Sequence, residues 1–136
     1  EPSRRQRQMC IRDRCNGKDV QTSAIKQIKD AYLFTSGLYF DEPQIRKGLE
    51  LLKEQSRYYR LGGDCYMYGM LASGLIDIVL EDTLKVHDYM ALVNVIEGAG
   101  GVITDKFGQD ISLDSDGSLV ASSTSSLHDE IIKLIN

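Results

Sequence analysis

The stretch HDYMALVNVIEGAGGVITD, residues 87–105, carries the clearest signal of secondary structure in this chain. It predicts a helix that begins near His87 and ends at the glycines of EGAGG, followed at once by a strand over VITD. These glycines indicate a helix stop and a close turn, because the glycines of a dinucleotide-binding loop would follow a strand and open a helix. The stretch therefore joins one helix directly to one strand.

The same alternation of helix-like and strand-like segments extends on both sides of this stretch. β-Branched and aromatic runs bounded by turn residues predict strands at residues 16–23, 30–37, 57–63, 75–81 and 118–123. Helical spacing of apolar residues predicts helices at residues 41–55, 64–74 and 125–136. Such alternation is typical of a layered α/β domain.

Two of these helices carry local start signals. In the helix at 41–55, Asp41 is the expected N-cap, and one apolar stripe is formed by Ile45, Leu49 and Leu52. In the last helix, Ser126 and Asp129 have the spacing of a capping box. Both signals predict where these helices begin.

Composition suits a single globular domain. The chain has 136 residues, of which 42% are hydrophobic and 26% charged. No apolar run approaches the roughly 18 to 20 residues that span a bilayer, and no secretory signal is visible, so no membrane partner is expected. The three cysteines (Cys10, Cys15 and Cys65) match no metal-ligand spacing and are expected to be free thiols in a reducing cytoplasm.

The arginine-rich start of the chain resembles a translated sequencing adaptor. Residues 4–13 read RRQRQMCIRD, which a transposase-derived adaptor encodes in frame as CGT CGG CAG CGT CAG ATG TGT ATA AGA GAC. The flanking adaptor bases are also compatible with Ser3 and Arg14. We therefore expect residues 1–14 to be an adaptor-derived, disordered artefact. We expect residues 15–136 to be the C-terminal part of a longer domain, since no initiating Met precedes CNGKDV and Met9 lies inside the adaptor-like run.

Setting that segment aside changes the charge of the domain. Residues 1–14 contribute +3 to the total of −4, so residues 15–136 carry a net charge of −7. An acidic domain repels the phosphate backbone of nucleic acid. No nucleic-acid partner is therefore expected.

Three carboxylates lie at the ends of predicted elements, where chemistry is often placed. Glu81 closes the strand at 75–81, while Asp64 and Asp88 open the two helices that flank it. Capping of a helix N-terminus explains Asp64 and Asp88 without any function. The alternative is that Asp88 binds a hard cation such as Mg²⁺, which prefers one or two carboxylates together with substrate phosphate.

The opening stretch resembles the C-terminal signature of the inositol monophosphatase family, W-D-x-x-A, a helix, E-A-G-G, and a strand that ends in Asp. The matching residues are His87, Asp88, Ala91, Glu97, Gly98, Ala99, Gly100, Gly101 and Asp105. The resemblance implies that Asp88 is a Mg²⁺ ligand and that Glu81, seven residues earlier, contacts the substrate. It also implies a layered α/β/α/β sugar-phosphatase fold, of which this chain is the C-terminal part, and a homodimer.

A second stretch, RLGGDCYMYGMLASGLIDIVLE at residues 60–81, resembles the histidinol-phosphatase branch of that family. The resemblance implies a phosphatase for L-histidinol phosphate, a small phosphorylated substrate held by Gly63, Asp64, Cys65 and Glu81. A carboxylate at position 64 suits that substrate, because it pairs with the amino group of histidinol through a charge-assisted hydrogen bond. Cys65 is not expected to act as a nucleophile, since the neighbouring Asp64 disfavours a thiolate.

The sequence departs from the family pattern in two places. His87 replaces the usual Trp or Tyr before the metal-binding Asp, and it is expected to be packed or solvated instead of a ligand. The family's other metal ligands, a Glu and a D-P-x-D-G-T segment, do not occur in this chain. The chain alone is therefore expected to lack phosphatase activity.

Alternatives stay open at this point. One is a phosphatase for inositol phosphate or another small sugar or nucleotide phosphate, and another is a non-catalytic binding module. Four tyrosines on neighbouring elements are expected to be packing residues instead of a binding face: Tyr58, Tyr59, Tyr66 and Tyr68.

Overall fold

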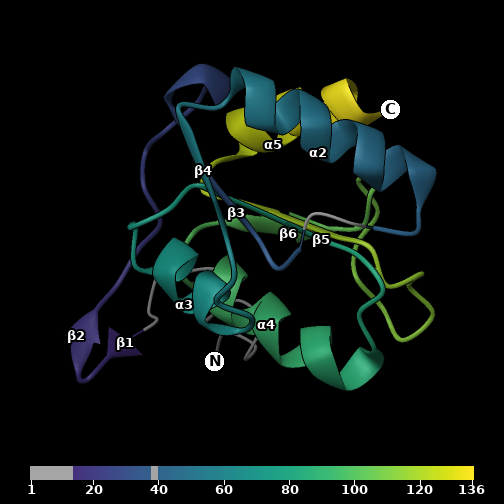
Figure 1. The fold of residues 1–136 in the computed structure, drawn as a ribbon. Coiled ribbons are helices and arrows are strands. Elements are labelled where there is room, and N and C mark those ends of the chain that lie inside the picture. The colour runs from purple at the N-terminus through teal and green to yellow at the C-terminus, as the bar shows by residue number, and fades with distance from the viewer. Residues whose placement is uncertain (1–13, 38–39) are drawn as a thin grey trace.

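The computed structural model describes residues 14–37 and 40–136, which form a five-stranded mixed sheet with helices on both faces (Figure 1). The strands of this sheet are β3 (Tyr32–Thr35), β4 (Tyr58–Leu61), β5 (Ile78–Glu81), β6 (Val102–Thr104) and β7 (Leu119–Ser122). The helices are η1 (Ile28–Asp30), α2 (Pro43–Gln55), α3 (Tyr66–Ala72), α4 (Val86–Gly98) and α5 (Ser125–Ile135). The expected α/β class is confirmed.

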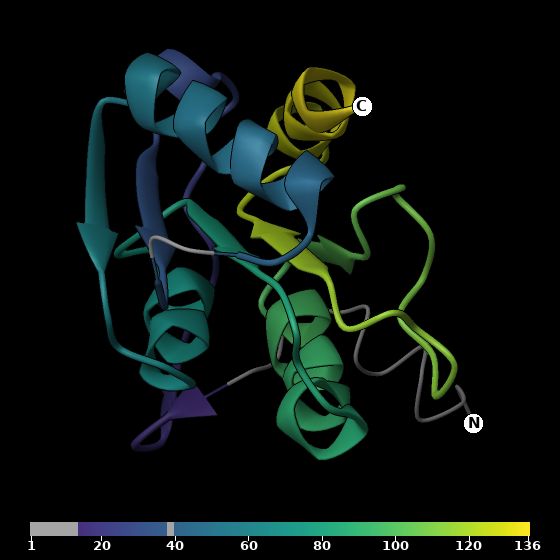
Figure 2. The ribbon, with the colours of Figure 1, turned by 45° about the vertical axis from the view of Figure 1, so that its right-hand side comes forward.

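The sheet has the strand order β4-β3-β5-β7-β6. β3 pairs in parallel with both β4 and β5, whereas β7 pairs antiparallel with β5 and β6. The central strand β5 is buried on both faces, with Ile78 and Leu80 in one core and Val79 in the other. Both faces of the sheet are therefore covered, as Figure 2 shows from the side.

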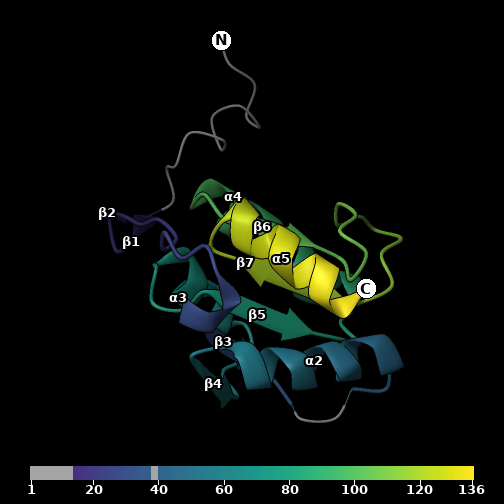
Figure 3. The same ribbon diagram turned by 90° about the horizontal axis from the view of Figure 1, so that it is seen from above.

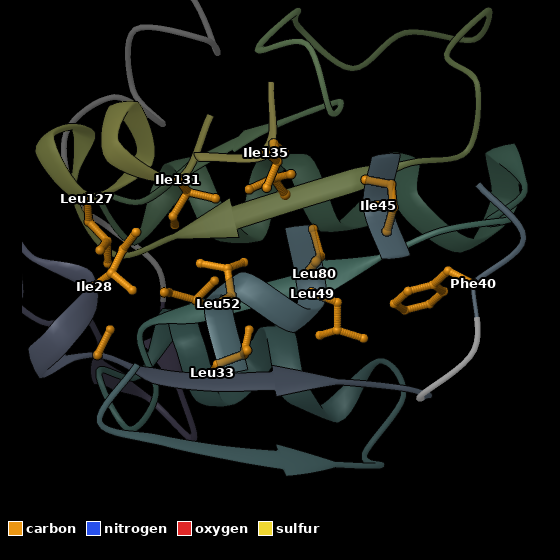
Figure 4. Close-up of a cluster of buried hydrophobic side chains, with 13 residues drawn as sticks. Ile28, Leu33, Phe40, Ile45, Leu49, Leu52, Leu80, Leu127, Ile131 and Ile135 are labelled. Atoms are coloured by element: carbon orange, nitrogen blue, oxygen red, sulfur yellow. The ribbon is translucent and has the colours of Figure 1, made fainter. Parts of the chain in front are cut away.

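One core lies between the sheet and the pair α2 and α5, which run side by side over the same face (Figure 3). The predicted stripe of Ile45, Leu49 and Leu52 is fully buried here, which confirms it. Figure 4 shows these side chains in one cluster with Leu80 of the sheet and with Ile131 and Ile135 of α5. Burial of this stripe, at roughly 1.5 to 3 kcal/mol per large apolar side chain, stabilises α2 more than its intrinsic helix propensity does.

The second core lies on the other face, below the sheet in Figure 1, where α3 and α4 pack. Met67, Tyr68 and Leu71 of α3 are buried there beside Ile96 of α4. This face positions the functional residues, because the helices that cover it begin beside the carboxyl end of β5.

Two helix caps differ from the predicted ones. The N-cap of α2 is Glu42 instead of Asp41, and its carboxylate accepts the backbone N–H of Gln44 at 3.2 Å. The N-cap of α5 is Thr124, whose hydroxyl accepts the N–H of Leu127 at 3.3 Å. Thr124 has extended backbone, as a cap requires, whereas Ser126 already lies inside the helix, so the capping box with Asp129 is wrong.

A short hairpin precedes the sheet. β1 (Arg14–Cys15) pairs antiparallel with β2 (Lys18–Asp19) through a turn at Asn16 and Gly17, both with positive φ, which confirms the predicted Asn-Gly turn. Arg14 donates to Asp19 across the hairpin at 2.9 Å, so this residue belongs to a strand and not to the segment expected to be disordered. The rest of the adaptor-like segment, residues 1–13, lies outside the described residues, and its interpretation stays a prediction.

The tyrosines differ from expectation. Tyr58, Tyr59 and Tyr66 are 51%, 42% and 72% exposed, so none of these three is a core residue. Tyr58 still packs edge-on against the ring of Tyr32, with 5.9 Å between the ring centroids, as expected of a packing residue. Tyr58 and Tyr59 lie on β4, an edge strand of the sheet, and Tyr66 lies at the start of α3. Tyr68 is buried as expected. Among the helices that the structure describes, none combines the length and the apolar character that a bilayer-crossing segment requires.

Candidate active site

A cleft of about 430 Å³ lies beside the carboxyl end of β5 and the N-terminal ends of α3 and α4. Its lining residues are Asp64, Cys65, Tyr68, Glu81, Leu84, His87, Asp88 and Leu92. The three carboxylates that the sequence singled out thus meet in one cleft, although they lie up to 24 positions apart in the chain. Gly63 is adjacent to Asp64 in the sequence, but it does not line the cleft.

Asp88 is the third residue of α4 and caps its first turn. Its Oδ2 accepts the backbone N–H of Lys85 at 2.8 Å, so the capping prediction is confirmed for this residue. Its Oδ1 lies 3.5 Å from Nε2 of His87, and the side chain is 44% exposed. One carboxylate oxygen is therefore fixed by the helix, while the other lies beside the exposed imidazole of His87.

That arrangement fits a single ligand to a divalent cation. Carboxylate oxygen is the ligand that Mg²⁺ prefers, and Mg²⁺ sites in phosphate-processing proteins use only one or two protein carboxylates. Within residues 14–37 and 40–136, no group of three His, Cys, Asp or Glu side chains is arranged to hold a metal ion. Asp88 therefore suits a metal site to which this part of the chain contributes one ligand.

Glu81 is the last residue of β5 and is only 4% exposed. Tyr68 is 1% exposed, and its hydroxyl donates a hydrogen bond to Oε2 of Glu81. Burial raises the pKa of Glu81, the hydroxyls of Tyr68 and Ser36 act in the opposite direction, and the negative charges of Asp64 and Asp88 raise it further. Burial beside this carboxylate also raises the pKa of Tyr68 well above its usual value, so the phenol stays protonated and remains a donor.

Asp64 lies in a turn with an uncommon backbone. Gly62, Gly63 and Asp64 have φ values of 91°, 116° and 44°, three successive residues in the left-handed region between β4 and α3. The cap position of α3 is Cys65, and the structure shows no side-chain cap there, so the capping explanation of Asp64 is wrong within the described residues. Aspartate tolerates this conformation better than most residues, and such backbone is frequent at functional sites.

The remaining predicted residues are placed as follows. Cys65 is an exposed free thiol that lines the cleft. The side chain of His87 is 78% exposed, which agrees with the expectation of a solvated residue. The sequence reasoning missed Tyr68, which it treated as a packing residue. The available signal was its position four residues after Asp64 in the helix predicted at 64–74, because residues four apart share one helix face.

Comparisons with known proteins agree with this geometry. The model of the inositol monophosphatase family matches residues 7–136. The chain is 38% identical over 112 residues to the chloroplastic bifunctional phosphatase IMPL2 of Arabidopsis thaliana. The aligned region covers 82% of this chain and 32% of the plant protein. It is 29% identical over 103 residues to the histidinol-phosphatase of Chlorobaculum parvum. That aligned region covers 75% of this chain and 40% of the bacterial protein.

A solved structure shows the same fold. The inositol monophosphatase of Zymomonas mobilis superposes with a TM-score of 0.84 at 31% identity, over 88% of this chain and 47% of that one. The chain thus spans less than half the length of these relatives. The sequence signature, the cleft and the match over residues 7–136 together show that this chain belongs to the inositol monophosphatase family.

Proposed function

We propose that the whole protein to which this chain belongs is a Mg²⁺-dependent phosphomonoesterase that hydrolyses L-histidinol phosphate to L-histidinol and phosphate. The observation that carries the proposal is the position of Asp64, which lines one cleft together with Glu81 and Asp88. The likeness to a histidinol-phosphatase and to a bifunctional phosphatase supports the same substrate class.

Asp88 is the residue that would hold the metal. Bound Mg²⁺ polarises the phosphoryl group and stabilises the charge that develops on it during hydrolysis. Asp88 is suited to this role because the hydrogen bond from Lys85 fixes its carboxylate at the start of α4. The negative potential of the cleft would otherwise repel a phosphate, so a cation beside Asp88 is also required for binding.

Asp64 and Glu81 would hold the alcohol part of the substrate. The amino group of histidinol is positively charged near neutral pH, and its attraction to Asp64 compensates for the loss of water from both groups. Glu81 is a buried acceptor for an N–H or O–H group of the substrate. Neither residue carries out a bond-breaking step in this proposal, since their part is to bind and orient.

A second substrate class is inositol monophosphate, which the likeness to the Zymomonas mobilis enzyme favours. Inositol presents only hydroxyl groups, for which a small neutral contact at position 64 suffices. The charge of Asp64 therefore separates the two substrates. A cytoplasmic homodimer is proposed as well, on the family likeness and on the free thiols of Cys15 and Cys65.

The substitution Asp64→Ser in the whole protein tests the substrate. We expect kcat/KM for L-histidinol phosphate to fall about 10- to 100-fold, since the lost hydrogen bond to a charged group is worth about 1.5 to 3 kcal/mol. The value for inositol 1-phosphate should stay unchanged. The matched control is Asp30→Ser, which removes an exposed carboxylate in η1. This element packs on the face of the sheet that does not carry the cleft. An equal loss for both substrates, or no loss for L-histidinol phosphate, would contradict the proposal.

A further inference from the structure

Tyr68 and Glu81 form a buried side-chain pair inside the cleft. Tyr68 comes from the first turn of α3 and Glu81 from the last position of β5, thirteen residues later. Both side chains line the cleft, and the phenol hydroxyl donates to Oε2 of the carboxylate. The tyrosine ring belongs to the core beneath the sheet, so its hydroxyl is held in place by packing.

The surroundings of Glu81 make this donor important. Like charges on Asp64 and Asp88 and the burial of the carboxylate oppose ionised Glu81, whereas the hydroxyls of Tyr68 and Ser36 favour it. Ser36 is exposed, and Tyr68 is 1% exposed. A hydrogen bond shielded from water is electrostatically stronger than one at the surface. Tyr68 is therefore the better fixed of the two donors.

We propose that Tyr68 is a positioning residue, which fixes one oxygen of Glu81 so that the carboxylate presents its remaining acceptor capacity to the alcohol part of the substrate. An ionised carboxylate accepts about four hydrogen bonds, and the bond from Tyr68 leaves capacity for a ligand. The inference rests on the proposed function in one respect, namely that this cleft holds the alcohol part. Tyr68 acts only through Glu81 and touches no reacting atom.

Binding of L-histidinol to the full chain tests the role. We expect Tyr68→Phe to weaken binding about ten-fold in an NMR titration, because the carboxylate loses a hydrogen bond to a charged group. The control is Tyr89→Phe, which also removes a buried phenol hydroxyl, but one that donates to the carbonyl of Ser112 at 3.3 Å and does not line the cleft. This variant should bind like wild type.

A double-mutant cycle separates positioning from packing. If Tyr68 acts through Glu81, Tyr68→Phe should cause no further loss in a Glu81→Gln background. Additive losses, or wild-type affinity in Tyr68→Phe alone, would overturn the proposal.

A spectroscopic measurement on the wild-type chain covers the remaining outcomes. If wild type does not bind L-histidinol, this chain by itself does not hold the alcohol part of the substrate, and the hydroxyl proton of Tyr68 then tests its role. That proton should be protected from exchange with water and should shift strongly in Glu81→Gln. A proton that exchanges freely or does not respond to Glu81→Gln would overturn the positioning role, and the same measurement applies if Tyr68→Phe fails to fold.

Discussion

His128 is enclosed between α5 and the sheet, where it is only 4% exposed. Its Nε2 lies 2.8 Å from Oγ1 of Thr104 on β6, and its Nδ1 lies 2.6 Å from Oγ of Ser122 on β7. Burial lowers the pKa of this imidazole from 6.5 to about 4, and the nearby charge of Asp129 only partly offsets the effect. His128 is therefore neutral in the folded protein near pH 7.

This histidine makes stability depend on pH. The unfolded chain binds a proton at position 128 below about pH 6.5, whereas the folded chain does so only below about pH 4. The free energy of unfolding should therefore fall as the pH is lowered through this window, by up to about 1.4 kcal/mol per pH unit.

Urea unfolding measures this effect as a difference in the free energy of unfolding between one pH inside the window and one pH above it. His128→Gln should remove this part of the pH dependence, although it costs stability near neutral pH through altered packing. His87→Gln is the control, because that side chain is 78% exposed and should leave the dependence intact. An unchanged dependence in His128→Gln would show that another group is responsible.

The connection from β5 to α4 carries Glu81 at one end and Asp88 at the other. Thr83 in this connection has φ of 61°, which is unusual for a β-branched residue. The backbone N–H of Leu84 donates to the carbonyl of Gly117 at 3.0 Å, which ties the connection to the turn before β7. The geometry of the cleft thus depends on a contact between two loops.

Gly117→Ala should disturb that contact. Gly117 has φ of 90°, and a Cβ there would lie 2.7 Å from the carbonyl oxygen of Leu84. We expect a loss of about 1 to 3 kcal/mol in the free energy of unfolding and shifted amide resonances for Leu84 and Asp88. Gly69→Ala, in an open position of α3, should instead be neutral or slightly stabilising. Equal stability of Gly117→Ala and wild type would show that the connection is not held in this way.

Across the whole molecule, this chain supplies one covered sheet and one side of a cleft. Asp88 is the single metal-ligand candidate, and no cluster of three metal-binding side chains occurs in the part of the chain that the structure describes. We therefore predict that the purified chain alone has no measurable phosphatase activity. The test is phosphate release from L-histidinol phosphate with Mg²⁺, with the Zymomonas mobilis inositol monophosphatase acting on inositol phosphate as a working control. Mg²⁺-dependent turnover by this chain that Asp88→Asn abolishes would refute the prediction.

The sequence by itself was sufficient for the order of helices and strands from β3 onward, the buried stripe of α2, the Asn-Gly turn, and the family signature around Asp88. These features depend on neighbours within a few positions, where periodicity and turn chemistry act. The helix caps at Glu42 and Thr124 were missed by one or two residues, because adjacent polar residues compete for the same cap.

The tertiary structure was needed for the rest of the site. Sequence reasoning did not predict the hydrogen bond between Tyr68 and Glu81, the left-handed backbone of Asp64, or the burial of His128 between two strands and a helix. It also did not predict that Tyr58 and Tyr59 are about half exposed, because the local sequence does not show that their strand lies at the edge of the sheet. The physical reason is common to all of them. Strand order and burial result from contacts between residues far apart in the chain, and these contacts leave no pattern in the local sequence.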